Sequence, residues 1–191
     1  MTTGYQIKEQ DQLYFVTFQV VNWVDIFTRK IYRDIVIENL TYCQKNKALE
    51  IYGFVIMSNH IHLLLKSGTN QLSKTIQEFK SYSSKQILKQ IETGPESRTE
   101  WMLNIFKQAA YKHQRNTNYQ FWTHENHAEH IYSNKFIEQK LNYIHQNPVR
   151  AGIVANENDY LYSSAVNYNG GKGVLDVELL MLQIQEHNLK T

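Results

Sequence analysis

Two apolar runs that almost touch in the sequence constrain the fold of this chain more than any other feature. They cover residues 49–57 and 61–66, and only residues 58–60 separate them. Two strand-like segments joined so closely form an antiparallel hairpin. An aromatic and β-branched segment upstream, residues 14–21, contains no glycine or proline and predicts another strand.

Two helices are expected around this hairpin. Thr28 is placed to cap the first helix, and the second covers about residues 71–91. The apolar stripe of the first helix consists of Ile31, Ile35, Val36, Leu40 and Cys43. The order strand, helix, strand, strand, helix and then strand predicts an α+β fold, a ferredoxin-like split βαβ antiparallel sheet. Both helices then cover one face of the sheet and leave the other face open.

The second half of the chain is expected to extend this unit. A short helix over residues 101–111 follows a cluster of helix breakers, and residues 119–122 are aromatic and β-prone. Residues 174–184 predict an amphipathic helix near the C-terminus. We expect one domain over residues 1–191, in which about 155–191 form a C-terminal extension.

Composition and charge exclude several classes of protein. The single cysteine, Cys43, excludes an intrachain disulfide framework or a cysteine-rich zinc site. No stretch approaches the roughly 20 apolar residues that a membrane helix needs, so we expect a cytoplasmic protein without a membrane contact. The net charge is only +2, but residues 66–115 carry nine basic and four acidic side chains, net +5. This segment is basic enough to contact phosphates, although a solvated helix face would have the same composition.

A His-hydrophobic-His pattern lies at the start of the second hairpin strand. Residues two apart in a strand share a face, so His60 and His62 point to one side while Ile61, Leu63 and Leu65 point to the other. The apolar set fits the helix-covered face. The two imidazoles would then lie side by side on the open face, where both can bind one divalent ion. The alternative is a pair of half-buried histidines that only hydrogen-bond to neighbours.

A later helix, about residues 133–147, carries a second chemical pattern. Ser133 or Asn134 caps it, and Pro148 is expected to end it near Asn147. Tyr143 and Asn147 are four residues apart and therefore share one helix face, beside the apolar stripe. A packed tyrosine and a helix-ending asparagine would explain the same residues without any chemistry.

Taken together, these motifs resemble the single-tyrosine HUH transposases of the insertion-sequence type, in their repeat-associated tyrosine transposase branch. The resemblance rests on the His-Ile-His strand and on the segment Asn142-Tyr-Ile-His-Gln-Asn-Pro-Val-Arg-Ala-Gly152, and it covers most of the chain. It implies a ferredoxin-like DNA strand transferase that cleaves and rejoins single-stranded DNA through a covalent 5′-phosphotyrosine.

The resemblance also implies roles for particular residues. Tyr143 would be the catalytic nucleophile, and His60, His62 and Asn147 would bind Mg²⁺ or Mn²⁺, with Asn147 where related transposases often have glutamine. The implied partner is single-stranded DNA flanked by a hairpin. No nucleotide cofactor is needed, and both a monomer and a homodimer fit the motifs.

Other polar residues are assigned from their positions. Lys74, Lys85 and Lys89 share the outward face of the second helix, and with Arg150 they are candidates for DNA binding. His124, His127 and His130 have spacings that would suit a second metal site. We interpret them instead as part of a polar loop in which His127 is a neighbour of the active site.

Two other functions use the same residues differently. A non-catalytic or domesticated module could bind single-stranded nucleic acid on the open sheet face through aromatic rings. A metal-dependent hydrolase would use water as the nucleophile, but it needs nearby carboxylates, and residues 57–66 contain none.

Overall fold

The structure is a computed structural model that describes residues 6–112 and 118–180. The strands of the described residues are β1 (Tyr14–Gln19), β2 (Leu49–Ile56), β3 (His60–Ser67) and β4 (Glu129–His130). The helices are α1 (Lys30–Lys47), α2 (Leu72–Thr93), α3 (Thr99–Lys112), α4 (Asn134–Arg150) and the short α5 (Ala165–Tyr168). None of these helices is both long and apolar enough to cross a bilayer.

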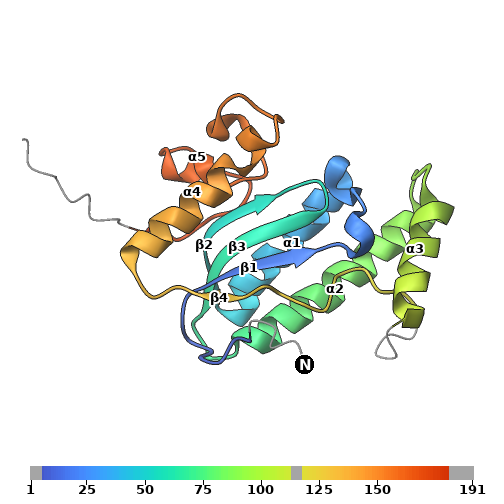
Figure 1. Cartoon of the computed structure of the whole chain (residues 1–191), viewed down its shortest axis with the longest axis horizontal. Coiled ribbons are helices and arrows are strands. Elements are labelled where there is room, and N and C mark those ends of the chain that lie inside the picture. The colour runs from blue at the N-terminus through green and yellow to red at the C-terminus, as the bar shows by residue number, and fades with distance from the viewer. Residues whose placement is uncertain (1–5, 113–117, 181–191) are drawn as a thin grey trace, which may run out of the picture.

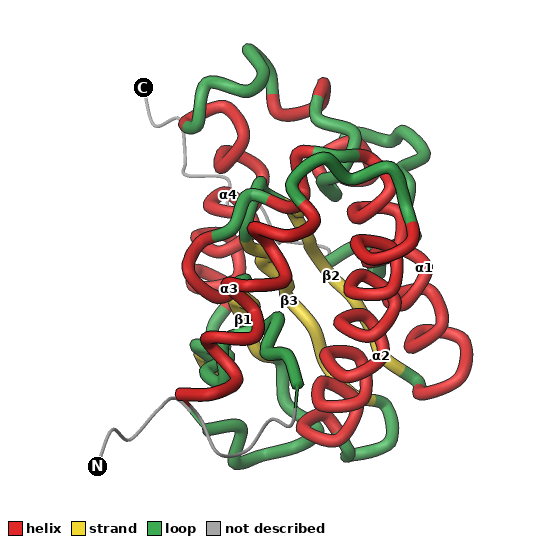
Figure 2. Tube along the Cα trace, turned by 90° about the vertical axis from the view of Figure 1, so that its right-hand side faces the viewer, coloured by secondary structure: helices red, strands yellow, loops and turns green. Residues whose placement is uncertain are grey.

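The strands form one antiparallel sheet in the order β2-β3-β1-β4. The hairpin of β2 and β3, with β1 beside β3, is the strand order of a ferredoxin-like sheet, so the predicted fold class is confirmed. Helices α1 and α2 lie together on one face of this sheet, and α4 lies on the other (Figures 1 and 2). The sheet face that we expected to be open is therefore partly covered by α4.

Alternation along β1 assigns side chains to the two faces. Phe18 contacts Phe79 of α2, with ring centroids 5.8 Å apart, and belongs to the main core. Phe15 points the other way and contacts Tyr143 of α4 at 5.9 Å. Phe15 is nevertheless buried, with only 4% of its surface exposed, because α4 covers it. The sheet thus has a small second core beneath α4.

A glycine allows α4 to approach the sheet closely. The pairing of β2 with β3 shifts register between Ile51 and Gly53, as at a β-bulge, and Gly53 faces α4 there. A Cβ atom at Gly53 would lie 2.7 Å from Leu141 Cδ2 and 3.4 Å from Ile144 Cδ1. The missing side chain therefore sets the distance between α4 and the strands.

Replacing Gly53 with valine is expected to lower the free energy of unfolding by about 1–3 kcal/mol, the usual effect of overpacking a core. Gly53→Ala should have a smaller effect, because the first atom displaced, Leu141 Cδ2, is the end of a flexible side chain. Urea denaturation of both variants measures this series. An unchanged unfolding midpoint in Gly53→Val would show that this close contact does not determine the distance between α4 and the sheet.

Helix α4 begins as predicted but ends later. The hydroxyl of Ser133 caps it by accepting a hydrogen bond from the Phe136 amide at 3.3 Å. The predicted end near Asn147 is wrong, because the helix continues through Pro148 to Arg150. Pro148 lies in the last turn, where its missing N–H removes a single helical hydrogen bond.

The start of α1 also differs from the prediction. Thr28 does not cap α1, because its hydroxyl donates to the Asp25 carbonyl within a short 3-10 helix, Ile26–Thr28. Arg29 occupies the N-cap position, and its side chain makes no capping hydrogen bond. Ile31, expected in the apolar stripe, is 45% exposed.

The free edge of β1 is covered by the segment that we expected to be a polar loop. The Thr123 amide donates to Gln19 at 2.8 Å, and the Thr17 amide donates to Asn126 at 2.9 Å, just before β4. Residues 124–128 form no helix or strand, as expected of a polar loop, but Glu129–His130 pair with β1 as β4. An edge strand needs partners for its backbone groups, and polarity alone does not reveal them.

The free edge of β2 is covered in the same way by the C-terminal part. The Ser164 amide donates to Phe54 at 3.0 Å and the Glu178 amide to Ile51 at 2.8 Å. Residues 174–180 form no helix, contrary to the prediction, because this edge contact keeps them extended. The rest of that predicted helix, residues 181–184, lies outside the described residues.

Candidate active site

The two histidines of β3 meet on the face of the sheet that α4 covers. The ring centroids of His60 and His62 are 4.7 Å apart. His62 is 5% exposed, whereas His60 is half-buried at the end of the strand. The period-two interpretation of this strand therefore places both imidazoles together, as predicted from the spacing.

Neighbouring side chains orient the two rings. Asn59 donates its Nδ2 to the Trp23 carbonyl at 3.3 Å, so its Oδ1 faces His60 Nδ1 at 2.7 Å. An amide oxygen only accepts, so the proton lies on His60 Nδ1 and the lone pair on Nε2. His62 Nδ1 bonds to the Thr17 hydroxyl at 2.8 Å, and its buried Nε2 has no hydrogen-bond partner among the described residues.

Burial keeps both rings neutral. It lowers the pKa of His60, and burial, together with the electrostatic effect of the nearby His60, Lys140 and Arg150, lowers the pKa of His62 to about 3. A neutral imidazole with a free nitrogen is the form that binds a metal ion. The pair therefore has the protonation state and the unpaired atoms of a two-histidine metal ligand.

Helix α4 brings Tyr143 to these histidines. Its ring meets the ring of His62 edge-on at 5.1 Å and that of Phe15 at 5.9 Å. The side chain is 39% exposed, and its phenol oxygen makes no hydrogen bond within the described chain. The phenol thus lies beside the imidazoles and remains accessible to a ligand from solvent.

Two cations flank this tyrosine. The guanidinium of Arg150 lies 4.6 Å from the centroid of the Tyr143 ring, and its Nη2 donates to the Tyr143 carbonyl at 2.9 Å. Lys140 Nζ lies 4.3 Å from the Phe15 centroid and pairs with Glu129 at 2.8 Å. These charges make the site attractive to an anion such as a phosphodiester.

Several residues of this site were missed in the sequence. Thr17, Asn59, Lys140 and Phe15 carry no motif of their own. The alternation of β1 would have placed Phe15 and Thr17 on one face, but only the strand register shows that this is the face of the histidines. Asn59 is adjacent to the motif, and the short hairpin loop was the available signal.

The structure does not bring all of the other predicted site residues to the histidine pair. Asn147 is half-buried one turn after Tyr143, and its side-chain amide makes no hydrogen bond to described residues. Lys74, Lys85 and Lys89 are exposed on α2, on the opposite side of the sheet from the histidines.

The histidines near β4 form no metal cluster. No three His, Cys, Asp or Glu side chains are placed to hold an ion anywhere in residues 6–112 and 118–180. His127 pairs with Glu125 at 3.7 Å and lines a cavity with Gln19, the strand partner of His60. His130 lies on β4 instead, with its ring 5.4 Å from that of Tyr14.

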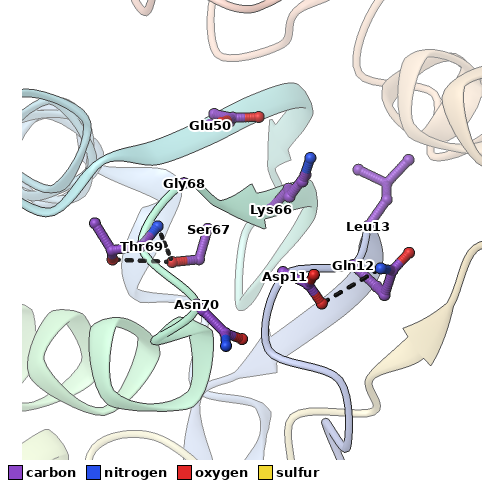
Figure 3. A pocket seen from close by; sticks show the side chains of 9 residues that line it. All are labelled: Asp11, Gln12, Leu13, Glu50, Lys66, Ser67, Gly68, Thr69 and Asn70. Atoms are coloured by element: carbon purple, nitrogen blue, oxygen red, sulfur yellow. Dashed lines mark hydrogen bonds between the residues drawn. The ribbon is translucent and has the colours of Figure 1, made fainter.

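A polar cavity of about 690 Å³ lies away from this site. Its walls include Asp11, Glu50 and Lys66, at the end of the β2–β3 hairpin far from His60 (Figure 3). This cavity is lined by two carboxylates and one lysine and contains no histidine, so it does not share the chemistry of the histidine site.

Comparisons with known proteins agree with the fold and identify a family. No curated protein matches the chain. A solved structure described as a REP-associated tyrosine transposase bound to a REP hairpin is 16% identical and has a TM-score of 0.58, covering 95% of this chain and 96% of that one. The family model for IS200-like transposases matches residues 11–111, which is more than half of the 191 residues. The chain therefore belongs to the IS200-like transposase family.

Proposed function

We propose that this protein cleaves and rejoins single-stranded DNA with Tyr143 as the nucleophile. The observation that carries the proposal is the accessible phenol of Tyr143, whose ring centroid lies 5.1 Å from that of His62, an imidazole whose buried Nε2 has no hydrogen-bond partner among the described residues. In the proposed step the phenol oxygen bonds to phosphorus, the bond from phosphorus to the 3′ oxygen breaks, and that oxygen leaves as a hydroxyl with the phenol proton. The product is a 5′-phosphotyrosine, which a 3′-hydroxyl attacks in the reverse sense to rejoin the strand.

His60 and His62 fit a divalent metal ion. Neither Nε2 atom has a hydrogen-bond partner in the part of the chain that the structure describes, burial keeps both rings neutral, and Asn147 is our proposed third ligand from α4. When bound, Mg²⁺ or Mn²⁺ would polarise the scissile phosphate. Two imidazoles and one amide leave positions open for phosphate and water, as a catalytic site needs.

The remaining side chains of the site position the nucleophile and the DNA. Arg150 lies against the Tyr143 ring, which restricts the ring and places a positive charge next to the phenol. Lys140 adds a second charge on the same face of the sheet. We propose weaker, sequence-independent contacts to the DNA backbone for Lys74, Lys85 and Lys89 on α2.

A non-catalytic module that stacks bases on the sheet fits the structure less well. The ring that β1 offers on the histidine face is Phe15, and it is buried under α4. On that face β3 carries His60 and His62 instead of aromatic rings. Base stacking on these strands would require α4 to leave the sheet.

A cleavage assay tests the proposal. Single-stranded oligonucleotides from the DNA that flanks the gene, labelled at the 3′ end, are incubated with the protein and Mn²⁺ or Mg²⁺ and resolved on a denaturing protein gel. We expect a labelled protein band that requires the metal. Cleavage without any labelled band would instead indicate water as the nucleophile.

Asn59 provides a test of the histidine pair that leaves both ligands in place. Asn59→Ala removes the acceptor that fixes the proton on His60 Nδ1, and such a change typically lowers metal affinity about 10- to 100-fold. Asn59→Asp keeps an acceptor and should retain most of the affinity. Titration calorimetry with Mn²⁺ measures both, and equal affinities in wild type and Asn59→Ala would contradict the role.

A further inference from the structure

A polar cavity of about 440 Å³ lies at the end of β1 that pairs with the His60 end of β3. Its wall includes Gln19, which is the direct strand partner of His60 in the pairing of β1 with β3. It also includes Trp23, whose carbonyl accepts a hydrogen bond from Asn59, the residue that orients His60. The cavity is therefore connected to the histidines through one strand pair and one hydrogen bond.

Trp23 lines this cavity with an exposed side chain and an unusual backbone conformation. Its side chain is 65% exposed, although large rings normally pack into the core. The backbone is left-handed at both Asn22 and Trp23, with φ of 53° and 56°, a conformation that bulky residues rarely adopt. Hydrogen bonds at 3.2 Å to Val20 and 3.3 Å from Asn59 hold it there. Strain of this kind concentrates at functional sites.

The other walls offer neutral hydrogen-bonding groups. Gln120 is 5% exposed, donates its Nε2 to the Trp122 carbonyl at 3.1 Å, and leaves Oε1 without a partner among the described residues. Gln19 contributes a second amide. The lining contains one lysine, Lys112, and one carboxylate, Glu125, which pairs with His127 at 3.7 Å. An aromatic face with amides beside it matches the face and edge of a nucleobase.

We propose that this cavity binds one unpaired base of the DNA strand, next to the phosphodiester that Tyr143 cleaves. Trp23 stacks on the base, and the amides of Gln19 and Gln120 bond to its edge. The inference rests on the proposed cleavage of single-stranded DNA. In this proposal, Trp23 holds the DNA strand in position relative to the histidines.

Abasic substitution combined with a Trp23 variant tests this directly. Binding is measured in the Tyr143→Phe background, with single-stranded oligonucleotides that carry the mapped cleavage site and one abasic nucleotide at successive flanking positions. Oligothymidine and its fully abasic analogue serve if no cleavage site is mapped. In the Trp23-containing protein, one abasic position should weaken binding about 5- to 100-fold.

Trp23→Ala should weaken binding to the intact strand by the same factor and should make the protein insensitive to that abasic position. Trp23→Phe, which keeps a stacking ring, should restore part of the affinity. Trp101→Ala is the matched control, because Trp101 is also exposed, at 51%, but lies on α3 outside the cavity. Thermal unfolding of each variant checks that the fold is intact.

The outcomes separate this inference from the proposed function. If the protein forms the tyrosine adduct but Trp23→Ala keeps both its affinity and its sensitivity to every abasic position, the base cavity is wrong and the cleavage chemistry stands. If no adduct forms but the abasic effect depends on Trp23, the cavity stands and the chemistry is wrong. Absence of any binding to single-stranded DNA would overturn both.

Discussion

Replacing Tyr143 with phenylalanine is expected to reduce DNA cleavage by at least about 10³-fold and to remove the covalent protein–DNA adduct, since the variant lacks the attacking oxygen. Folding should be unchanged. The phenol oxygen makes no hydrogen bond within the described residues, and a phenylalanine ring can keep the contacts with His62, Phe15 and Arg150. Affinity for single-stranded DNA should therefore stay within a few-fold of wild type.

Tyr132→Phe is the matched control for this experiment. Tyr132 is 79% exposed and precedes α4, so it undergoes the same chemical change away from the histidines. We expect wild-type cleavage in Tyr132→Phe. Tyr143→Phe that still forms an adduct would show that another tyrosine attacks, whereas cleavage without an adduct would favour a hydrolase.

Loss of a histidine should have the second largest effect. His60→Ala is expected to reduce cleavage by at least about 10²-fold and to weaken Mn²⁺ binding, because one imidazole alone is a poor ligand. His60 is the cleaner position to change. His62 packs between Phe15 and Tyr143, so its removal would also disturb the nucleophile.

His130→Ala controls for the loss of an imidazole as such, since His130 lies on β4 beside Tyr14. Cleavage assays and Mn²⁺ titration calorimetry on both variants measure the effect. The role of His60 would be contradicted if His60→Ala bound Mn²⁺ and cleaved DNA as well as His130→Ala does.

Much of this architecture could be predicted because it depends on local patterns. The short link between two apolar runs gives the hairpin, and period two alone places His60 and His62 on one face. The four-residue spacing of Tyr143 and Asn147 places them on one side of a helix. These inferences need only the geometry of a single element.

The remaining features depend on contacts between elements. Period two does not reveal that Thr17 lies opposite His62, because register is set by the whole sheet. The close packing of α4 on the sheet depends on the missing side chain of Gly53. The sequence pattern does not distinguish this glycine from the other residues of its strand. Pro148 predicts a helix end, but a proline in the last turn removes only one hydrogen bond, and α4 continues to Arg150.

The same reason explains the segments that were misjudged. Residues 123–130 are mostly polar and residues 174–180 predict an amphipathic helix, yet both segments hydrogen-bond to the edges of the sheet. Their structure is determined by the unpaired backbone of β1 and β2, which their own sequences do not encode. Trp23 likewise carries no motif that distinguishes it in the sequence.

The most direct test of the proposed chemistry is to identify the amino acid that becomes linked to DNA. Wild-type protein is incubated with a single-stranded flanking oligonucleotide and Mn²⁺, digested with protease and nuclease, and analysed by mass spectrometry. The account predicts one peptide from α4 that carries a nucleotide 5′-phosphate on Tyr143. A nucleotide on any other residue, or cleaved DNA with no modified peptide, would contradict it.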